Sequence, residues 1–303
     1  MREPTSSGPA AFWLVPLLVA ALWVPPMIAA SYGWRHGEYY DYGWFVPPAA
    51  LWLVVRRWNE LGGLVSLSWQ RLALAAVVLV PWFLVLRILG QADPSWRLPM
   101  GLLGLTAAVV SHGLIAAARG WRFSAGFGWI TLLALSAIPW PSMVEQRIVE
   151  NLTDGVIHAV AEWFQISGRP VEIVGDRLRL HDMTVEVTDG CSGVRSFQSF
   201  VMATWFFAEL QRMRATRVLI LLACACGAAF VVNMVRTWAL ATIRFDHGVE
   251  AFERAHDWLG LLAFVASAVF FYGLSGRLSA APRRKLIRTV SSNAERPRLK
   301  IED

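Results

Sequence analysis

The chain has 303 residues, of which 56% are hydrophobic and 17% charged, and its mean hydropathy is +0.45. A soluble domain of this size could not bury so much apolar surface, so the composition excludes a water-soluble globular protein and indicates a membrane protein. The net charge of +6 is small for this length and lies largely in loops and the tail, which indicates membrane topology and not nucleic-acid binding.

Apolar runs of about 20 residues predict membrane-spanning helices. Candidate spans lie near residues 11–30, 43–56, 70–90, 98–118, 123–140, 194–210, 216–242 and 257–276. Basic residues occupy alternate gaps between these runs: Arg56 and Arg57; Arg119 and Arg122; Arg212, Arg214 and Arg217; and Arg283, Arg284 and Lys285. Because basic loops stay in the cytoplasm, the sequence predicts an all-α polytopic membrane protein with about eight transmembrane helices and both termini cytoplasmic.

The longest of the outward gaps, residues 141–193, contains two kinds of element. Apolar side chains repeat every four residues at Val144, Ile148, Leu152, Val156, Val160 and Phe164. Charged residues such as Glu145 break this run, so we expect an amphipathic helix on the membrane surface. Residues 171–174, 177–180 and 183–188 alternate as strands do, which predicts a small β-meander before Cys191.

Cys191 lies between the last predicted strand and a predicted helix. A thiol at a helix N-terminus is stabilised as thiolate, and Gly193 beside it would let a substrate backbone approach. Arg195 shares a helix face with Cys191 if the helix begins at the cysteine. Cys224 and Cys226 lie near the cytoplasmic half of another predicted span, beyond disulfide reach, so Cys191 is expected to be an unpaired thiol. The alternative for Cys191 is an inert residue that caps a helix.

Two further polar residues are predicted on the same outer face. Arg236 is flanked by apolar residues, and an arginine within a membrane is costly unless it faces a polar cavity or a partner. Asn233, one turn earlier, could form hydrogen bonds in that cavity. His256 is expected to open the last span. The alternatives are that Arg236 reaches the membrane surface and that His256 caps a helix.

Cys191, Arg236 and His256 therefore supply a nucleophile, a cation and a base from three consecutive predicted helices. The other histidines show no metal-ligand spacing, so we expect no metal site and no cofactor.

Three motifs resemble the exosortase/archaeosortase family: Asp189-Gly-Cys191-Ser192-Gly193-Val-Arg195-Ser, Asn233-Met-Val-Arg236 and His256-Asp-Trp-Leu-Gly260. The resemblance covers about residues 145–270. It implies a membrane cysteine protease or transpeptidase of the inner membrane that faces the periplasm. Its substrates would be exported proteins with a C-terminal sorting signal, which consists of a short motif such as Pro-Glu-Pro, a transmembrane helix and a basic cluster.

By this resemblance, Cys191 would form a thioester, Arg236 would stabilise charge and His256 would handle protons. Arg195, Asn233, Ser192 and Gly193 are the expected supporting residues. Water, an external amine, an exopolysaccharide or a lipid would accept the product.

Hydropathy, charge and the resemblance together predict a division of the chain. We expect residues 1–140 to form an N-terminal five-helix membrane region, residues 141–276 the catalytic core, and residues 277–303 a basic cytoplasmic tail that is partly disordered. The rival function is that of a non-catalytic membrane subunit of a polysaccharide export or transport system. In that case Arg236 and His256 would be polar contacts and Cys191 would only pack.

Overall fold

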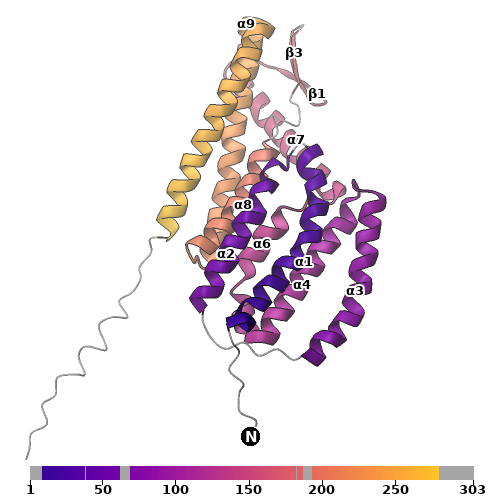
Figure 1. Cartoon of the computed structure of the whole chain (residues 1–303). Coiled ribbons are helices and arrows are strands. Elements are labelled where there is room, and N and C mark those ends of the chain that lie inside the picture. Colours follow the sequence, from indigo (N-terminus) through magenta and orange to yellow (C-terminus); the bar gives the residue numbers. More distant parts are fainter. Residues whose placement is uncertain (1–8, 38, 62–68, 182, 187–192, 280–303) are drawn as a thin grey trace, which may run out of the picture.

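The computed structural model describes residues 9–37, 39–61, 69–181, 183–186 and 193–279. Most of these residues form helices arranged roughly side by side, and a small sheet lies at one end (Figure 1). The elements are α1 (Pro9–His36), η1 (Asp41–Phe45), α2 (Val46–Leu61), α3 (Trp69–Ala92), α4 (Arg97–Arg119), α5 (Trp121–Ala125), α6 (Gly128–Ser136), α7 (Ser142–Ile166), β1 (Glu172–Val174), β2 (Arg177–Leu180), β3 (Met183–Glu186), α8 (Val194–Leu210) and α9 (Ala215–Ser279).

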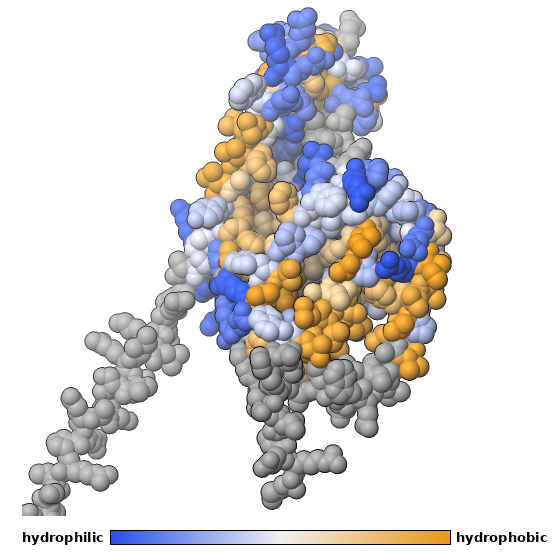
Figure 2. Space-filling view, viewed as in Figure 1, coloured by the Kyte–Doolittle hydropathy of each residue, from blue (hydrophilic) through white to orange (hydrophobic). Residues whose placement is uncertain are grey.

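Three of the described helices are long and apolar enough to cross a membrane: Phe12–His36, Arg97–Arg119 and Ala215–Ser279. Hydrophobic side chains gather over the helical part of the surface, whereas hydrophilic side chains cover the end that carries the sheet (Figure 2). The chain is therefore a helical membrane protein with a small sheet. The full number of eight spans stays a prediction.

Helix α9 is a hairpin of two helical arms, residues 215–247 and residues 249–279. Gly248 separates them because its φ of 83° lies in the left-handed region, which glycine adopts without strain. Arg217 donates a hydrogen bond to the carbonyl of Leu278 at 3.1 Å, which holds the far ends of the arms together. The predicted gap between the last two spans, residues 243–256, is therefore helical except for Gly248. The second arm contains the predicted last span, residues 257–276, but begins earlier, at residue 249.

The expected continuous helix over residues 123–140 is also wrong. Two short helices, α5 and α6, occupy this stretch, and α6 ends at Ser136. Pro139 and Pro141 follow, and proline both lacks the amide hydrogen that a helix needs and disfavours helical backbone in the residue before it. The chain therefore leaves α6 in an extended connection and enters α7 directly.

The described basic clusters lie at one end of the bundle, with the start of α1. The Arg119 guanidinium lies over the ring of Trp58, at 4.1 Å from the ring centroid, and also over Phe12. Arg212, between α8 and α9, pairs with Glu60 at the end of α2. Their contacts place three of the predicted cytoplasmic clusters together; Arg283, Arg284 and Lys285 lie outside the described residues.

Helix α7 and the sheet form a second core at the opposite end. The strands pair antiparallel in the order β1-β2-β3, and Leu178 lies opposite Val185. Both side chains are buried against α7 and the first arm of α9, where they meet Val160, Phe164 and Phe245. The predicted amphipathic helix and β-meander are thus present. The sheet lies beside the turn of α9 (Figure 1).

The buried face of α7 differs from the prediction in its first turns. Val144 is 49% exposed, whereas Glu145 is 8% exposed. Glu145 accepts hydrogen bonds from the Tyr40 hydroxyl and the Arg97 guanidinium, so its charge is satisfied inside the protein. Burial and this hydrogen bond raise the pKa of Tyr40 far above its usual value. The Glu145 contacts connect α7 to the N-terminal helices.

Candidate functional site

Arg236 and His256 meet across the two arms of α9. The Nη2 atom of Arg236 lies 3.1 Å from Nε2 of His256. A guanidinium only donates hydrogen bonds, so Nε2 must accept and is unprotonated in this arrangement. The contact therefore corresponds to a neutral His256 whose ring proton is on Nδ1.

The residues around His256 orient its ring. Nδ1 faces Oδ1 of Asp257 at 3.2 Å, and Phe252, one turn earlier, packs with a ring-centroid separation of 6.0 Å. A carboxylate on the distal nitrogen fixes the tautomer of a histidine. The Asp257 side chain is 95% exposed, so water weakens this hydrogen bond. The Phe252 ring therefore restricts the His256 ring together with Asp257.

The start of α8 packs against the same region of α9. Gly193 is the N-cap of α8 and has a φ of 81°. A Cβ atom at this position would lie 3.1 Å from both Cβ and Cγ of Asn233, which is only 6% exposed. Asn233 and Arg236 are one turn apart on the first arm, so α8 begins directly beside the Arg236 helix. Only glycine combines this backbone with this close approach.

The second arm also approaches closely. Gly260 lies one turn beyond His256, and a Cβ atom at position 260 would lie 3.5 Å from Nη2 of Arg236. A side-chain atom at this position would therefore be at ordinary van der Waals distance from the guanidinium. Gly260 thus lies beside the Arg236 side chain, and Gly193 lies beside Asn233, one turn earlier on the first arm.

A cavity of about 430 Å³ opens next to His256. It is lined by residues of β3 (Thr184, Val185 and Glu186), of the first arm of α9 (Arg244) and of the second arm (Phe252, Glu253 and His256). Its size lies within the range of about 300–1,000 Å³ that is usual for small-molecule sites. The cavity would hold a few residues of a peptide beside the imidazole.

Several buried polar atoms near the first turns of α8 and the middle of α9 have no hydrogen-bond partner among the described residues. These are both amide atoms of Gln198, the Thr237 hydroxyl, Nε of Arg236 and Nε1 of Trp238. Gln198 is completely buried. Buried polar groups are normally paired, so this interior offers donors and acceptors to a polar ligand or to water.

The predicted residues have different outcomes. Arg236, His256, Asn233 and Gly193 come together as described, whereas Cys191 and Ser192 lie outside the described residues. The described helix α8 begins at Val194, and its Arg195 is exposed. Cys191 and Arg195 were expected to share a helix face only if the helix began at Cys191. The helix begins at Val194 instead.

Some residues at the site were not predicted to take part. Asp257 had a clear signal, because it follows His256 directly in the sequence. Arg244 and Phe252 were missed because residues 243–256 were expected to form a loop. Gly260 stands in the family motif, but its contact with Arg236 depends on how the hairpin folds.

A comparison with known families extends the resemblance noted in the sequence. The family described as transmembrane exosortase (Exosortase_EpsH) matches residues 34–273. The match begins near the end of α1, so it includes most of the N-terminal helices as well as the region of about 145–270. No curated protein and no solved structure matches the chain. Because the match covers well over half of the 303 residues, the chain belongs to the transmembrane exosortase family.

Proposed function

We propose that the protein is a cysteine protease or transpeptidase that cleaves C-terminal sorting signals of exported proteins at the outer face of the inner membrane. Residues 141–276 would be its catalytic core, with Cys191 as nucleophile. The observation that supports this most directly is the Arg236–His256 contact at 3.1 Å, beside a cavity of about 430 Å³. A base and a cation lie together at a surface opening, in a chain of the exosortase family.

The first step would be the activation of the thiol. His256 is neutral in the observed arrangement, so it can take the proton of Cys191. The lone pair of Nε2 cannot hold both that proton and the hydrogen bond from Arg236. We infer that the Arg236 guanidinium turns away from His256 as the proton arrives. Its N–H groups then point to the negative charge that develops on the substrate.

The thiolate would attack the carbonyl carbon of the scissile peptide bond, which breaks the C=O π bond and forms an oxyanion. Arg236 would stabilise the oxyanion, because a planar guanidinium offers several N–H donors and keeps its charge. Collapse of this intermediate breaks the C–N bond, and His256 returns the proton to the leaving amine. The resulting thioester would react with an acceptor amine, an acceptor hydroxyl or water. This reaction regenerates the thiol.

Gly193 and Asn233 would position the segment that leads from the nucleophile into α8. A Cβ atom at position 193 would lie 3.1 Å from Asn233, so the backbone of Gly193 runs close to the helix that carries Arg236. We propose that Ser192 and Arg195 support the site as neighbours of this segment. None of these four residues needs to exchange a proton with the substrate.

The orientation in the membrane follows from charge. The described basic clusters gather at the end of the bundle opposite the sheet, and basic loops stay in the cytoplasm. We propose that the sheet and the His256 cavity face the periplasm and that both termini are cytoplasmic. A reporter fused at residue 165 should then give an extracytoplasmic signal. A cytoplasmic signal at this position would contradict the proposed site.

The enzymatic function is tested by replacing the nucleophile. Cys191→Ala should abolish processing of a substrate that carries a sorting motif, a transmembrane helix and a basic cluster. Cys224→Ala and Cys226→Ala are matched controls and should leave processing intact, since both residues lie about 15–18 Å from Arg236 along the first arm of α9. Unchanged processing by the Cys191→Ala variant would favour the non-catalytic subunit of an export system.

A further inference from the structure

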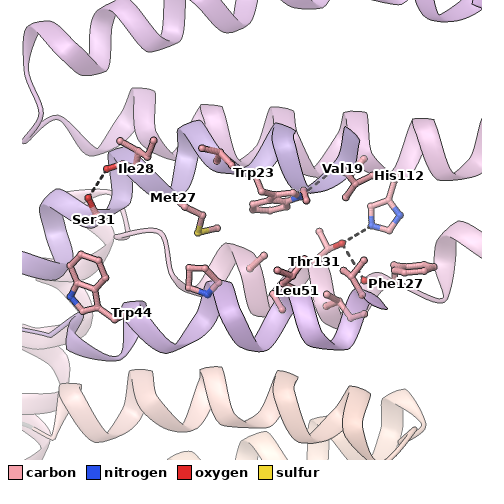
Figure 3. Close-up of a pocket in the computed structure, with 18 of the residues that line it drawn as sticks. Val19, Trp23, Met27, Ile28, Ser31, Trp44, Leu51, His112, Phe127 and Thr131 are labelled. Carbon is pink, nitrogen blue, oxygen red and sulfur yellow. Dashed lines mark hydrogen bonds between the residues drawn. The ribbon is translucent and has the colours of Figure 1, made fainter. Parts of the chain in front are cut away.

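A second cavity, of about 520 Å³, lies within the N-terminal helices and has a different character (Figure 3). It runs between α1, α2, α4 and α6, and we call it the α1–α2 groove. Apolar side chains dominate its walls, among them Val24, Met27, Ile28, Leu51 and Ile130. Val24, Ile28 and Leu51 are each more than half exposed, so the groove opens sideways to the surroundings of the bundle. Since α1 is long and apolar enough to cross a membrane, those surroundings are the lipid phase.

The polar groups at one end of the groove are already paired. Trp23 donates to the Ser111 hydroxyl at 3.2 Å. His112 bonds to Ser124 at 2.8 Å and to Thr131 at 2.9 Å. Figure 3 shows Trp23, His112 and Thr131 gathered at this end. These groups therefore require no polar partner from a ligand, and an apolar occupant suits this end.

The opposite end holds a cation. Arg35 lines the groove in the last turn of α1, donates to the Ser31 hydroxyl at 3.3 Å and lies over the Trp44 ring at 5.8 Å. Among the described residues, no Asp or Glu lines the groove or forms an ion pair with Arg35. The Arg35 guanidinium lies at the mouth of an apolar channel, where its charge can attract an anion. An anionic amphiphile matches both features.

The dimensions favour a hydrocarbon chain over a helix. A transmembrane helix is about 10 Å wide, so a length of about 20 Å occupies on the order of 1,600 Å³, several times the cavity volume. From Val19 to Arg35 the groove follows α1 for about 24 Å at 1.5 Å per residue. One leaflet of hydrocarbon is about 15 Å thick, so a lipid chain fits along the groove.

We propose that the α1–α2 groove binds one acyl chain of an anionic phospholipid of the bilayer, whose phosphate pairs with Arg35. The chain contacts Met27, Ile28 and Leu51, and the aromatic ring of Trp44 lies at the headgroup, where tryptophan is favoured. This binding site does not depend on whether Cys191 is catalytic. It gives the N-terminal helices a role of their own.

The test uses the full-length protein in vesicles of defined composition. A phosphatidylglycerol probe with a diazirine in its acyl chain is photoactivated, and the labelled peptides are mapped by mass spectrometry. We expect labelling to concentrate on α1 and α2 at the groove. Arg35→Gln should lower this labelling about fivefold, the effect of losing one basic residue near the headgroups. Ala50→Trp, which fills the groove, should lower it at least as much.

Two matched variants control for charge and bulk. Arg87→Gln removes an exposed arginine from α3, and Val109→Trp adds a ring to an exposed position on α4 outside the groove. Both should label like the wild type. A diacylglycerol probe, which lacks the phosphate, should label equally in the wild type and in Arg35→Gln.

Three results would overturn the proposal. Labelling spread over all exposed apolar surface in proportion to area would mean that only annular lipid is present. Unchanged labelling in Arg35→Gln, a mild substitution that leaves the helices intact, would exclude the phosphate contact. Loss of the lipid label on addition of a sorting-signal helix would show that the groove binds that helix instead.

Discussion

Replacement of Arg236 by lysine tests the contact on which the proposed chemistry depends. Lysine keeps the positive charge but loses the planar fork, so it cannot both contact His256 and present further N–H donors to an oxyanion. In the structure, Nη2 reaches His256 at 3.1 Å, and a Cβ atom at position 260 would lie 3.5 Å from the same nitrogen. A hydrogen bond from a charged donor contributes about 1.5–3 kcal/mol. The expected loss in kcat/KM is therefore about 10- to 150-fold.

The assay measures cleavage of a sorting-signal substrate by purified protein in vesicles. Arg254→Lys is the matched control, because Arg254 is exposed, lies two residues from His256 and donates only to the carbonyl of Glu250. This variant should cleave at the wild-type rate. If Arg236→Lys retains activity within about twofold of the wild type, or if Arg254→Lys loses as much, the role assigned to Arg236 is wrong.

Three further variants test the site and its support. His256→Ala should slow cleavage by about 10²–10⁴-fold, because the proposed base is lost, whereas His158→Ala, at an exposed position on α7, should not. Cleavage by His256→Ala at the wild-type rate would refute the base role. Gly193→Ala should destabilise the protein by about 1–2 kcal/mol, because the backbone at position 193 is left-handed and the new Cβ atom would crowd Asn233. Gly113→Ala, where a Cβ atom meets nothing, should not destabilise it. Equal unfolding temperatures for the two variants would contradict the close approach of Gly193 to Asn233. Glu145→Gln should lower the free energy of unfolding by about 1–3 kcal/mol in thermal unfolding, because it leaves Arg97 and Tyr40 imperfectly paired. Glu150→Gln, on the exposed face of α7, should have little effect. A similar loss in both variants would argue against a specific role for Glu145.

The sequence alone predicted the structure of segments whose residue pattern follows burial. The strands at 172–174, 177–180 and 183–186 lie where alternation predicted them, and β2 and β3 each bury one side chain on the core side, Leu178 and Val185, whereas all three residues of β1 are exposed. Hydropathy and the basic clusters predicted that Arg236 and His256 come from consecutive helices and lie on the same membrane face. Their direct contact was not predicted.

The remaining features depend on tertiary contacts that no local pattern reports. Gly248 alone ends one helical arm of α9, although charged residues around it are typical of a loop. Glu145 is buried because Tyr40 and Arg97 come from distant parts of the chain to meet it. The α1–α2 groove had no signal in the sequence, since apolar residues that line a cavity resemble those that face lipid.

The central claim is that Cys191 forms a covalent thioester with the substrate, and mass spectrometry of the protein during turnover tests it most directly. A substrate with a Pro-Glu-Pro motif, a transmembrane helix and a basic cluster is mixed with the full chain, and the reaction is quenched in acid. The proposed mechanism predicts a mass increase that maps to the peptide containing Cys191, disappears on treatment with hydroxylamine and is absent in Cys191→Ala. Cleavage without any adduct on Cys191, or an adduct on Cys224 or Cys226 in its place, would contradict it.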